Sequence, residues 1–142
     1  MVAKPMTVTK TQFQQLSRKL QRVHRIVLEN ERVAAEIRLG RQISALEFFN
    51  LLTQDEHFQW VQPLVALIAE IDEHIDEAEK ESRDLKEEDL AAFRAKVEYT
   101  LLDPKSSVRD RYLQYLSQDT DLVIAHAELR ADLGPAPKTQ LN

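Results

Sequence analysis

Cysteine is absent from this 142-residue chain, and glycine occurs only twice, as Gly40 and Gly134. Without cysteine there is no disulfide, no thiolate nucleophile and no cysteine-ligated metal or iron–sulfur cluster. Two glycines cannot assemble a phosphate-cradling loop or the Gly-x-Ser-x-Gly turn of serine hydrolases. An all-β fold would also need more turn residues than the chain has. These absences exclude several classes of enzyme and favour a helical protein.

Long hydrophobic runs are missing as well. No segment approaches the 18 apolar residues of a membrane span, and residues 1–9 lack the apolar stretch of a secretory signal. We therefore expect a cytoplasmic protein that does not enter a membrane. The absence of cysteine agrees with a reducing compartment.

Composition predicts the fold class. Hydrophobic residues make up 43% of the chain, which is enough for one continuous core at this length. Ala, Leu, Glu, Gln, Lys and Arg are frequent, and all of them favour helix. The sequence therefore predicts an all-α, single-domain helical bundle of about five to six helices with a long N-terminal helix. We expect residues 9–134 to form the bundle, residues 1–8 to be a flexible N-terminus and residues 135–142 to be a disordered tail.

Start and stop signals divide the chain into six helical segments. Thr9 and Gln12 form a capping box that predicts the start of the first helix, and Gly40 predicts its end. Ser44 and Glu47 form a second capping box. The later signals predict a third helix from Thr53 or Asp55 that restarts or bends at Pro63. A fourth helix is predicted from the buried stripe Leu90, Phe93, Val97 and Leu101. Asp103 is predicted to cap a fifth helix with Pro104 in its first turn, and a sixth helix is predicted from residues 119–121 to Gly134.

The first helix carries the most regular apolar pattern. Its members are spaced alternately by three and four residues, the heptad pattern of a helix–helix seam, and Asn30 is the only polar member. The seam can pack against the third helix of the same chain, or it can join two chains in a homodimer whose register Asn30 sets. Both hypotheses need the same stripe. The seam consists of Phe13, Leu16, Leu20, Val23, Val27, Asn30, Ala34 and Ile37.

Charge is distributed unevenly along the chain. Residues 1–41 carry a net charge of +6, whereas residues 42–103 carry −11. The basic first helix could bind nucleic acid, or it could lie against acidic helices within the fold. We do not expect nucleic-acid binding, because the whole chain is acidic and has no recognition-helix or aromatic RNA-binding motif.

The best candidate for a metal site is a cluster of Glu70, Glu73, His74 and Glu77. Spacings of three and four residues place them along one side of the third helix, where a hard cation could bind. Acidic helix surfaces of this kind are usually only solvated, and the Glu-x-x-His motif of diiron bundles is absent at every histidine. We therefore expect neither a metal nor a cofactor, and we name no catalytic residue.

Four aromatic residues, Phe48, Phe49, Phe58 and Trp60, fall within thirteen positions. They can cap the end of the bundle with the Trp60 indole N–H at the rim, or they can form a partner surface or an apolar ligand pocket. We predict a small cytosolic adaptor or regulatory protein that binds a protein partner through these residues and Asn30 and associates with itself. The alternatives are a small-molecule or metal-binding bundle, which could be an enzyme, and a nucleic-acid-binding accessory protein that uses the basic first helix.

Overall fold

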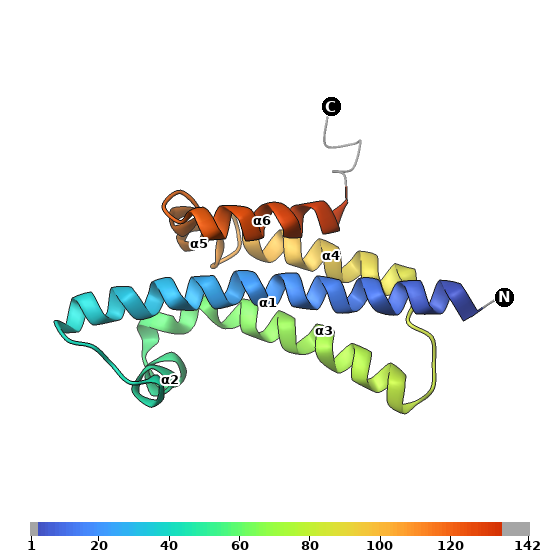
Figure 1. The fold of residues 1–142 in the computed structure, drawn as a ribbon, viewed down its shortest axis with the longest axis horizontal. Helices are drawn as coiled ribbons and strands as arrows, with labels where there is room; N and C mark the ends of the chain where they lie inside the picture. The colour runs from blue at the N-terminus through green and yellow to red at the C-terminus, as the bar shows by residue number, and fades with distance from the viewer. Residues whose placement is uncertain (1–2, 135–142) are drawn as a thin grey trace.

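The computed structural model describes residues 3–134, and within them it contains helices and no strand (Figure 1). The predicted all-α bundle is confirmed. Residues 1–2 and the predicted disordered tail, residues 135–142, lie outside the described residues. The elements are α1 (Ala3–Leu39), α2 (Ala45–Gln54), the 3-10 helix η1 (Glu56–Val61), α3 (Gln62–Lys80), α4 (Glu87–Leu102), α5 (Arg109–Leu116) and α6 (Thr120–Leu133).

Helix α1 runs the length of the molecule and organises the bundle (Figure 1). It packs mainly against α3 on one side and α6 on the other, while α4 contacts α1, α3 and α6. Short α5 connects α4 to α6, and α2 stands apart from the four long helices (Figure 1). The largest side chains of the core are Phe13, Leu16, Leu20, Phe58, Leu64, Ile71, Leu90, Leu101, Tyr112, Leu122 and Leu129.

Three predicted helix ends are confirmed, because local signals determine them. Gly40 has a φ of 73° and ends α1, with its N–H bonded to the Glu36 carbonyl at 2.8 Å. The Ser44 hydroxyl caps α2 by accepting the N–H of Glu47 at 3.1 Å. Asp119 caps α6 in the same way.

The third predicted helix is two elements. Asp55 caps η1 by accepting the N–H of His57 at 2.9 Å. Helix α3 then begins at Gln62, so Pro63 is its second residue and does not bend it. Proline fits there because its missing N–H would have no partner within the helix. Of the two predictions for Pro63, a new start is confirmed.

Two predicted boundaries are wrong. The backbone is helical from Ala3, so the first helix begins before Thr9, its predicted start. Pro5 lies in the first turn, where proline is tolerated, and Thr9 is a buried residue within the helix instead of its cap. Asp103 does not cap the fifth helix, which begins at Arg109. Its carboxylate accepts the N–H of Lys105 at 2.8 Å and closes a turn before that helix.

The seam on α1 is buried in its first part only. Its five members from Phe13 to Val27 are fully buried within the chain. From Val27 onward the buried stripe continues through Glu31 and Ala35, whereas Ile37 is 77% exposed. Ile37 is therefore not part of the stripe that is buried within the single chain. A straight helix has 3.6 residues per turn, so a strict heptad pattern drifts away from the buried face.

Because only the first part of the seam is buried, two substitutions in the seam should lower the free energy of unfolding by different amounts. Leu20→Ala removes a fully buried side chain and should lower the free energy of unfolding by about 2–5 kcal/mol. Ile37→Ala should change it by less than about 0.5 kcal/mol, because the side chain is mostly in solvent. Urea unfolding followed by circular dichroism measures both. Equal costs would show that the seam is buried along its whole length.

Candidate functional site

A buried carboxylate, Glu31, lies where α1, η1 and α5 meet. Its side chain is only 1% exposed. The indole N–H of Trp60 on η1 donates to Glu31 Oε1 at 2.6 Å, and the hydroxyl of Tyr115 on α5 donates to Oε2. A guanidinium nitrogen of Arg111, one turn earlier on α5, lies 3.8 Å from Oε2. One carboxylate therefore joins three elements of the fold.

The surroundings of Glu31 compensate for its burial. A buried carboxylate costs several kcal/mol unless it is paired and hydrogen-bonded, and here it has two donors and a nearby cation. The Arg111 guanidinium also lies 5.5 Å from the centre of the Trp60 ring, a cation–π contact. Burial and the bond to Glu31 raise the pKa of Tyr115 to about 12, so its hydroxyl remains a donor at neutral pH. The cluster is satisfied within the chain and acts as an anchor.

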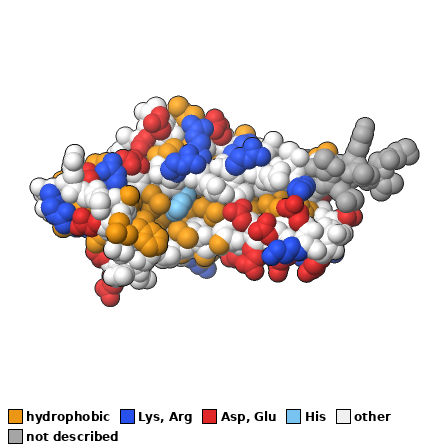
Figure 2. All heavy atoms as spheres, turned by 60° about the horizontal axis from the view of Figure 1, so that its bottom comes forward, with side chains coloured by type: hydrophobic (Ala, Val, Ile, Leu, Met, Phe, Trp, Pro, Cys, Tyr) orange, Lys and Arg blue, Asp and Glu red, His pale blue; other side chains and the backbone are white. Residues whose placement is uncertain are grey.

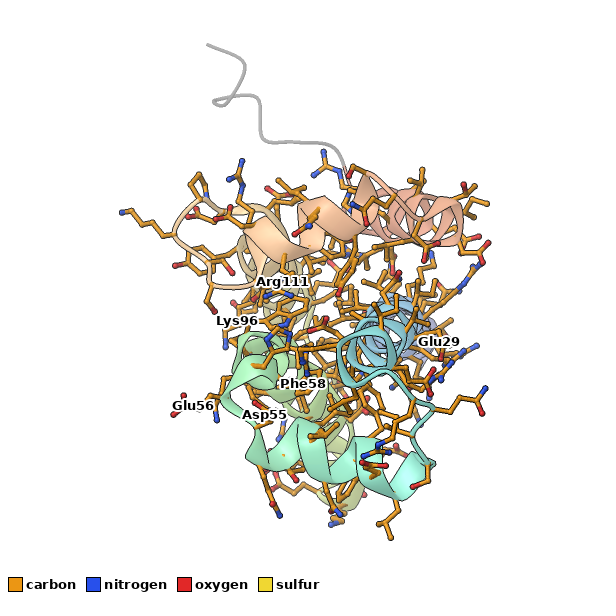
Figure 3. All side chains as sticks on the ribbon, turned by 90° about the vertical axis from the view of Figure 1, so that its left-hand side faces the viewer. Glu29, Asp55, Glu56, Phe58, Lys96 and Arg111 are labelled. Carbon is orange, nitrogen blue, oxygen red and sulfur yellow. The ribbon has the colours of Figure 1, made fainter. Side chains whose placement is uncertain are left out.

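The anchor fixes η1, and η1 supports α2. Phe58 and Val61 of η1 are buried in the core, and Figure 3 shows Phe58 between α2 and the rest of the molecule. The Phe48 ring of α2 meets the Phe58 ring edge-on, with centroids 5.9 Å apart. The side chain of Gln62 donates to the carbonyl of Leu52 at 3.3 Å. Helix α2 is thus attached to the bundle through η1.

Helix α2 has an apolar composition and no buried residue. Six of its ten residues are Ala, Leu or Phe. Leu46 is 70% exposed and Phe49 is 59% exposed, and the last turn of α1 adds exposed Ile37 and Leu39. We call Leu46 and Phe49 the α2 surface. Figure 2 shows apolar side chains gathered at the end of the molecule that carries α2. Apolar side chains that are exposed together on one helix face can mark a binding site.

The structure separates the four aromatic residues that were predicted as one surface. Phe58 is fully buried, and Phe48 is partly buried against it. Trp60 is partly buried, and its indole N–H is directed at Glu31 instead of the rim, so that expectation is wrong. Phe49 alone of the four presents a mostly exposed ring.

Asn30 connects two helices of the same chain. Its amide nitrogen donates to Asp119 Oδ2 at 2.8 Å and to the Ile26 carbonyl at 3.0 Å. The hydrogen bond from Asn30 is the main cause that lowers the pKa of Asp119, the residue that caps α6. The structure therefore places Asn30 in the contact between α1 and α6, with its donors used within the chain.

The metal candidates on α3 do not converge. The His74 ring lies between the rings of Phe13 and Phe93, at 5.4 and 5.3 Å, and its Nε2 is 3.3 Å from Asp89 Oδ2 on α4. His74 thus faces the bundle, while the three carboxylates of the cluster are exposed. Across the described part of the chain, no three His, Asp or Glu side chains are grouped so that they could hold a metal ion. The exposed carboxylates are Glu70, Glu73 and Glu77.

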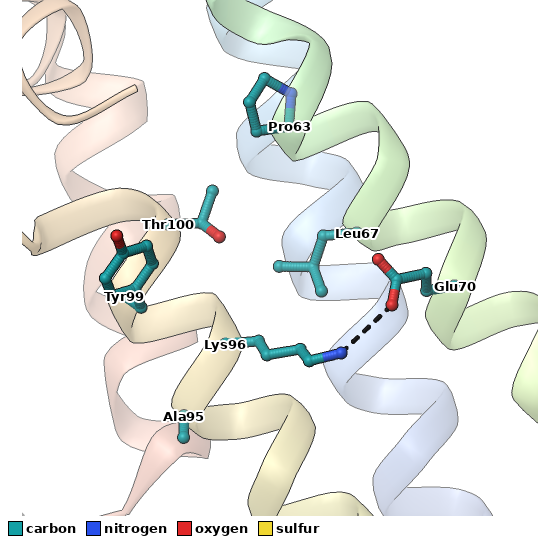
Figure 4. Close-up of a pocket in the computed structure, with 7 residues that line it drawn as sticks. All are labelled: Pro63, Leu67, Glu70, Ala95, Lys96, Tyr99 and Thr100. Atoms are coloured by element: carbon teal, nitrogen blue, oxygen red, sulfur yellow. Dashed lines mark hydrogen bonds and ion pairs between the residues drawn. The ribbon is translucent and has the colours of Figure 1, made fainter. Parts of the chain in front are cut away.

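A shallow groove of about 310 Å³ lies between α3 and α4 (Figure 4). Leu67 and Tyr99 supply apolar lining, and Lys96 Nζ reaches across to Glu70 Oε1 at 3.2 Å. Both charged side chains are more than half exposed and pair with each other. The groove therefore lacks the enclosed polar groups that orient a small ligand.

Four basic side chains of α1 pair with carboxylates of the same chain. Such surface pairs are individually weak, but together they offset the positive charge of the first helix. This arrangement corresponds to the hypothesis that the basic helix lies against acidic ones. The pairs are Lys10 with Glu79, Lys19 with Asp132, Arg22 with Glu128, and Arg32 with Glu29 and Glu36.

The burial of Glu31 was not predicted from the sequence, although the spacing of the apolar residues before it indicates it. Steps of four residues from Val23 through Val27 lead to Glu31, so a helix of 3.6 residues per turn brings its side chain toward the core. The heptad pattern led instead to Asn30. A charged residue on a buried stripe indicates that partners are supplied from elsewhere in the fold.

Comparison with protein-family models, with curated proteins and with solved structures found no match to this chain. No helix in residues 3–134 has the length and apolar character needed to cross a membrane. Any proposal about function therefore depends on the geometry of the chain itself.

The anchor predicts a large difference between two neighbouring glutamates. Glu31→Ala leaves the Trp60 indole and the Tyr115 hydroxyl without their acceptor, so it should lower the free energy of unfolding by about 2–5 kcal/mol. Glu29→Ala, on the exposed face of the same helix, should cost less than about 0.5 kcal/mol. Urea unfolding measures both, and the fluorescence of Trp60, the only tryptophan, reports the site. Similar costs for the two variants would rule out the anchor.

Proposed function

We propose that this chain is a cytoplasmic protein-interaction module, with an adaptor or regulatory role, that binds a protein partner through the α2 surface. The observation that supports this proposal is that α2 is rich in Leu and Phe and yet buries none of its residues. Burying a Leu or Phe side chain contributes about 1.5–3 kcal/mol. A partner that covers Leu46 and Phe49 would gain this contribution.

The α2 helix is formed before any partner binds. Ser44 caps its first turn, Arg41 pairs with Glu47, and the N–H of Asp55 bonds to the Leu51 carbonyl at 2.9 Å at its end. The anchor at Glu31 fixes the η1 segment on which it rests. A surface that is already ordered loses little conformational entropy on binding, which favours affinity.

The exposed residues fit recognition by another helix or by an apolar groove. Leu46 and Phe49 are three residues apart, so they lie on one face of α2. Anchors at such spacing are used when one helix packs on another protein surface. The buried Glu31 cluster has both oxygens engaged, so its contribution is to position this surface.

Site-specific photo-crosslinking tests the proposal. A photoreactive phenylalanine derivative in place of Phe49 should form covalent adducts with protein in the cytoplasm of the organism that encodes the chain. The same derivative in place of Ile124, which is 47% exposed on α6, is the matched control and should give several-fold less adduct. Electrophoresis and mass spectrometry measure the adducts and identify them. Equal yields at the two positions would refute α2 as the binding surface.

A further inference from the structure

We propose that the partner on the α2 surface is a second copy of this chain, docked so that the two α2 helices pack antiparallel across a twofold axis. This inference rests on the proposed function of the α2 surface. It follows from two properties of α2: an exposed face with Phe49 at its centre, and flanking residues of opposite charge at its two ends.

A twofold axis across α2 would bring its exposed face against the same face of the second copy. It presents Leu46, Phe49, Asn50 and Thr53, all exposed. The midpoint of α2 lies between Phe49 and Asn50, so a twofold axis there sets Leu46 against Thr53 of the second copy. The Thr53 hydroxyl already donates to the Phe49 carbonyl at 3.2 Å. Its methyl group is therefore available to Leu46 without loss of a hydrogen bond.

The two ends of α2 carry opposite charge. Arg38 and Arg41 precede the helix, and Asp55 and Glu56 follow it. Figure 3 shows Glu56 pointing away from the body of the molecule. Arg41 pairs with Glu47, and the Arg38 guanidinium lies 6.0 Å from the centre of the Phe58 ring, whereas Glu56 forms no ion pair with another residue that the structure describes. Antiparallel packing brings the basic end of each copy to the acidic end of the other and opposes the two helix dipoles, whereas parallel packing would join like charges.

The size of the surface indicates the strength of the dimer. A contact centred on one ten-residue helix is smaller than the roughly 800 Å² per partner of a stable protein interface. We therefore expect a dissociation constant on the order of 10 μM or weaker. Sedimentation velocity of the full chain, over a concentration series that brackets this value, should show a monomer–dimer equilibrium.

Charge reversal gives the decisive test. Arg41→Glu and Glu56→Arg should each weaken self-association at least tenfold, because each places like charges at both ends of the contact. An equimolar mixture of the two variants should form a heterodimer, since every cross-contact again joins opposite charges. This recovery also shows that both variants are folded. Glu73→Arg, which makes the same charge change on the exposed side of α3, is the control and should associate like the unaltered chain.

A second pair of variants, one test and one control, examines the apolar part of the contact. Phe49→Ser should abolish the dimer, and Ile124→Ser, on the exposed side of α6, should leave it unchanged. A chain that is monomeric throughout the series, or single charge variants that dimerise as well as the unaltered chain, would overturn the antiparallel dimer. If Phe49 still gives adducts with a different protein, the α2 surface is a binding site and only its occupant is wrong. If it gives none above the control, the proposed function fails as well.

Discussion

The carboxylate of Glu31 determines how one end of this molecule is built. Both η1 and α5 are short, with six and eight residues, and helices of that length are not stable alone in water. Their positions depend on tertiary contacts: both bury side chains in the core, and the hydrogen bonds from Trp60 and Tyr115 to Glu31 join both to α1. The carboxylate is tolerated in the interior because two donors and the Arg111 cation offset its lost hydration.

The position of α2 follows from that anchor. The chain leaves α1 at Gly40, forms α2 and returns to the core through Phe58 and Val61 of η1. With η1 held on α1, α2 lies outside the core formed by α1, α3, α4 and α6, and its Leu46 and Phe49 side chains stay mostly in solvent. Exposed apolar surface lowers solubility and adds nothing to stability, and the proposed contact on α2 would cover it.

The sequence predicted the features that depend on local chemistry. Gly40, Ser44 and Asp119 end or cap their helices as expected, because these signals act over one turn. It did not predict Glu31, whose partners Trp60 and Tyr115 lie 29 and 84 positions away. The aromatic residues were found, but their division into buried and exposed members depends on tertiary packing. The start at Ala3 was missed because the signal at Thr9 resembles a true cap.

The most direct test of this account is the nuclear magnetic resonance signal of the Trp60 indole N–H, which is unique because the chain has one tryptophan. Bonded to a buried carboxylate, this proton should exchange slowly with water, show nuclear Overhauser effects to the Tyr115 ring and shift strongly in Glu31→Gln. An indole proton that exchanges rapidly, shows no effect to Tyr115 and ignores that substitution would contradict the anchor and the position of α2 that depends on it.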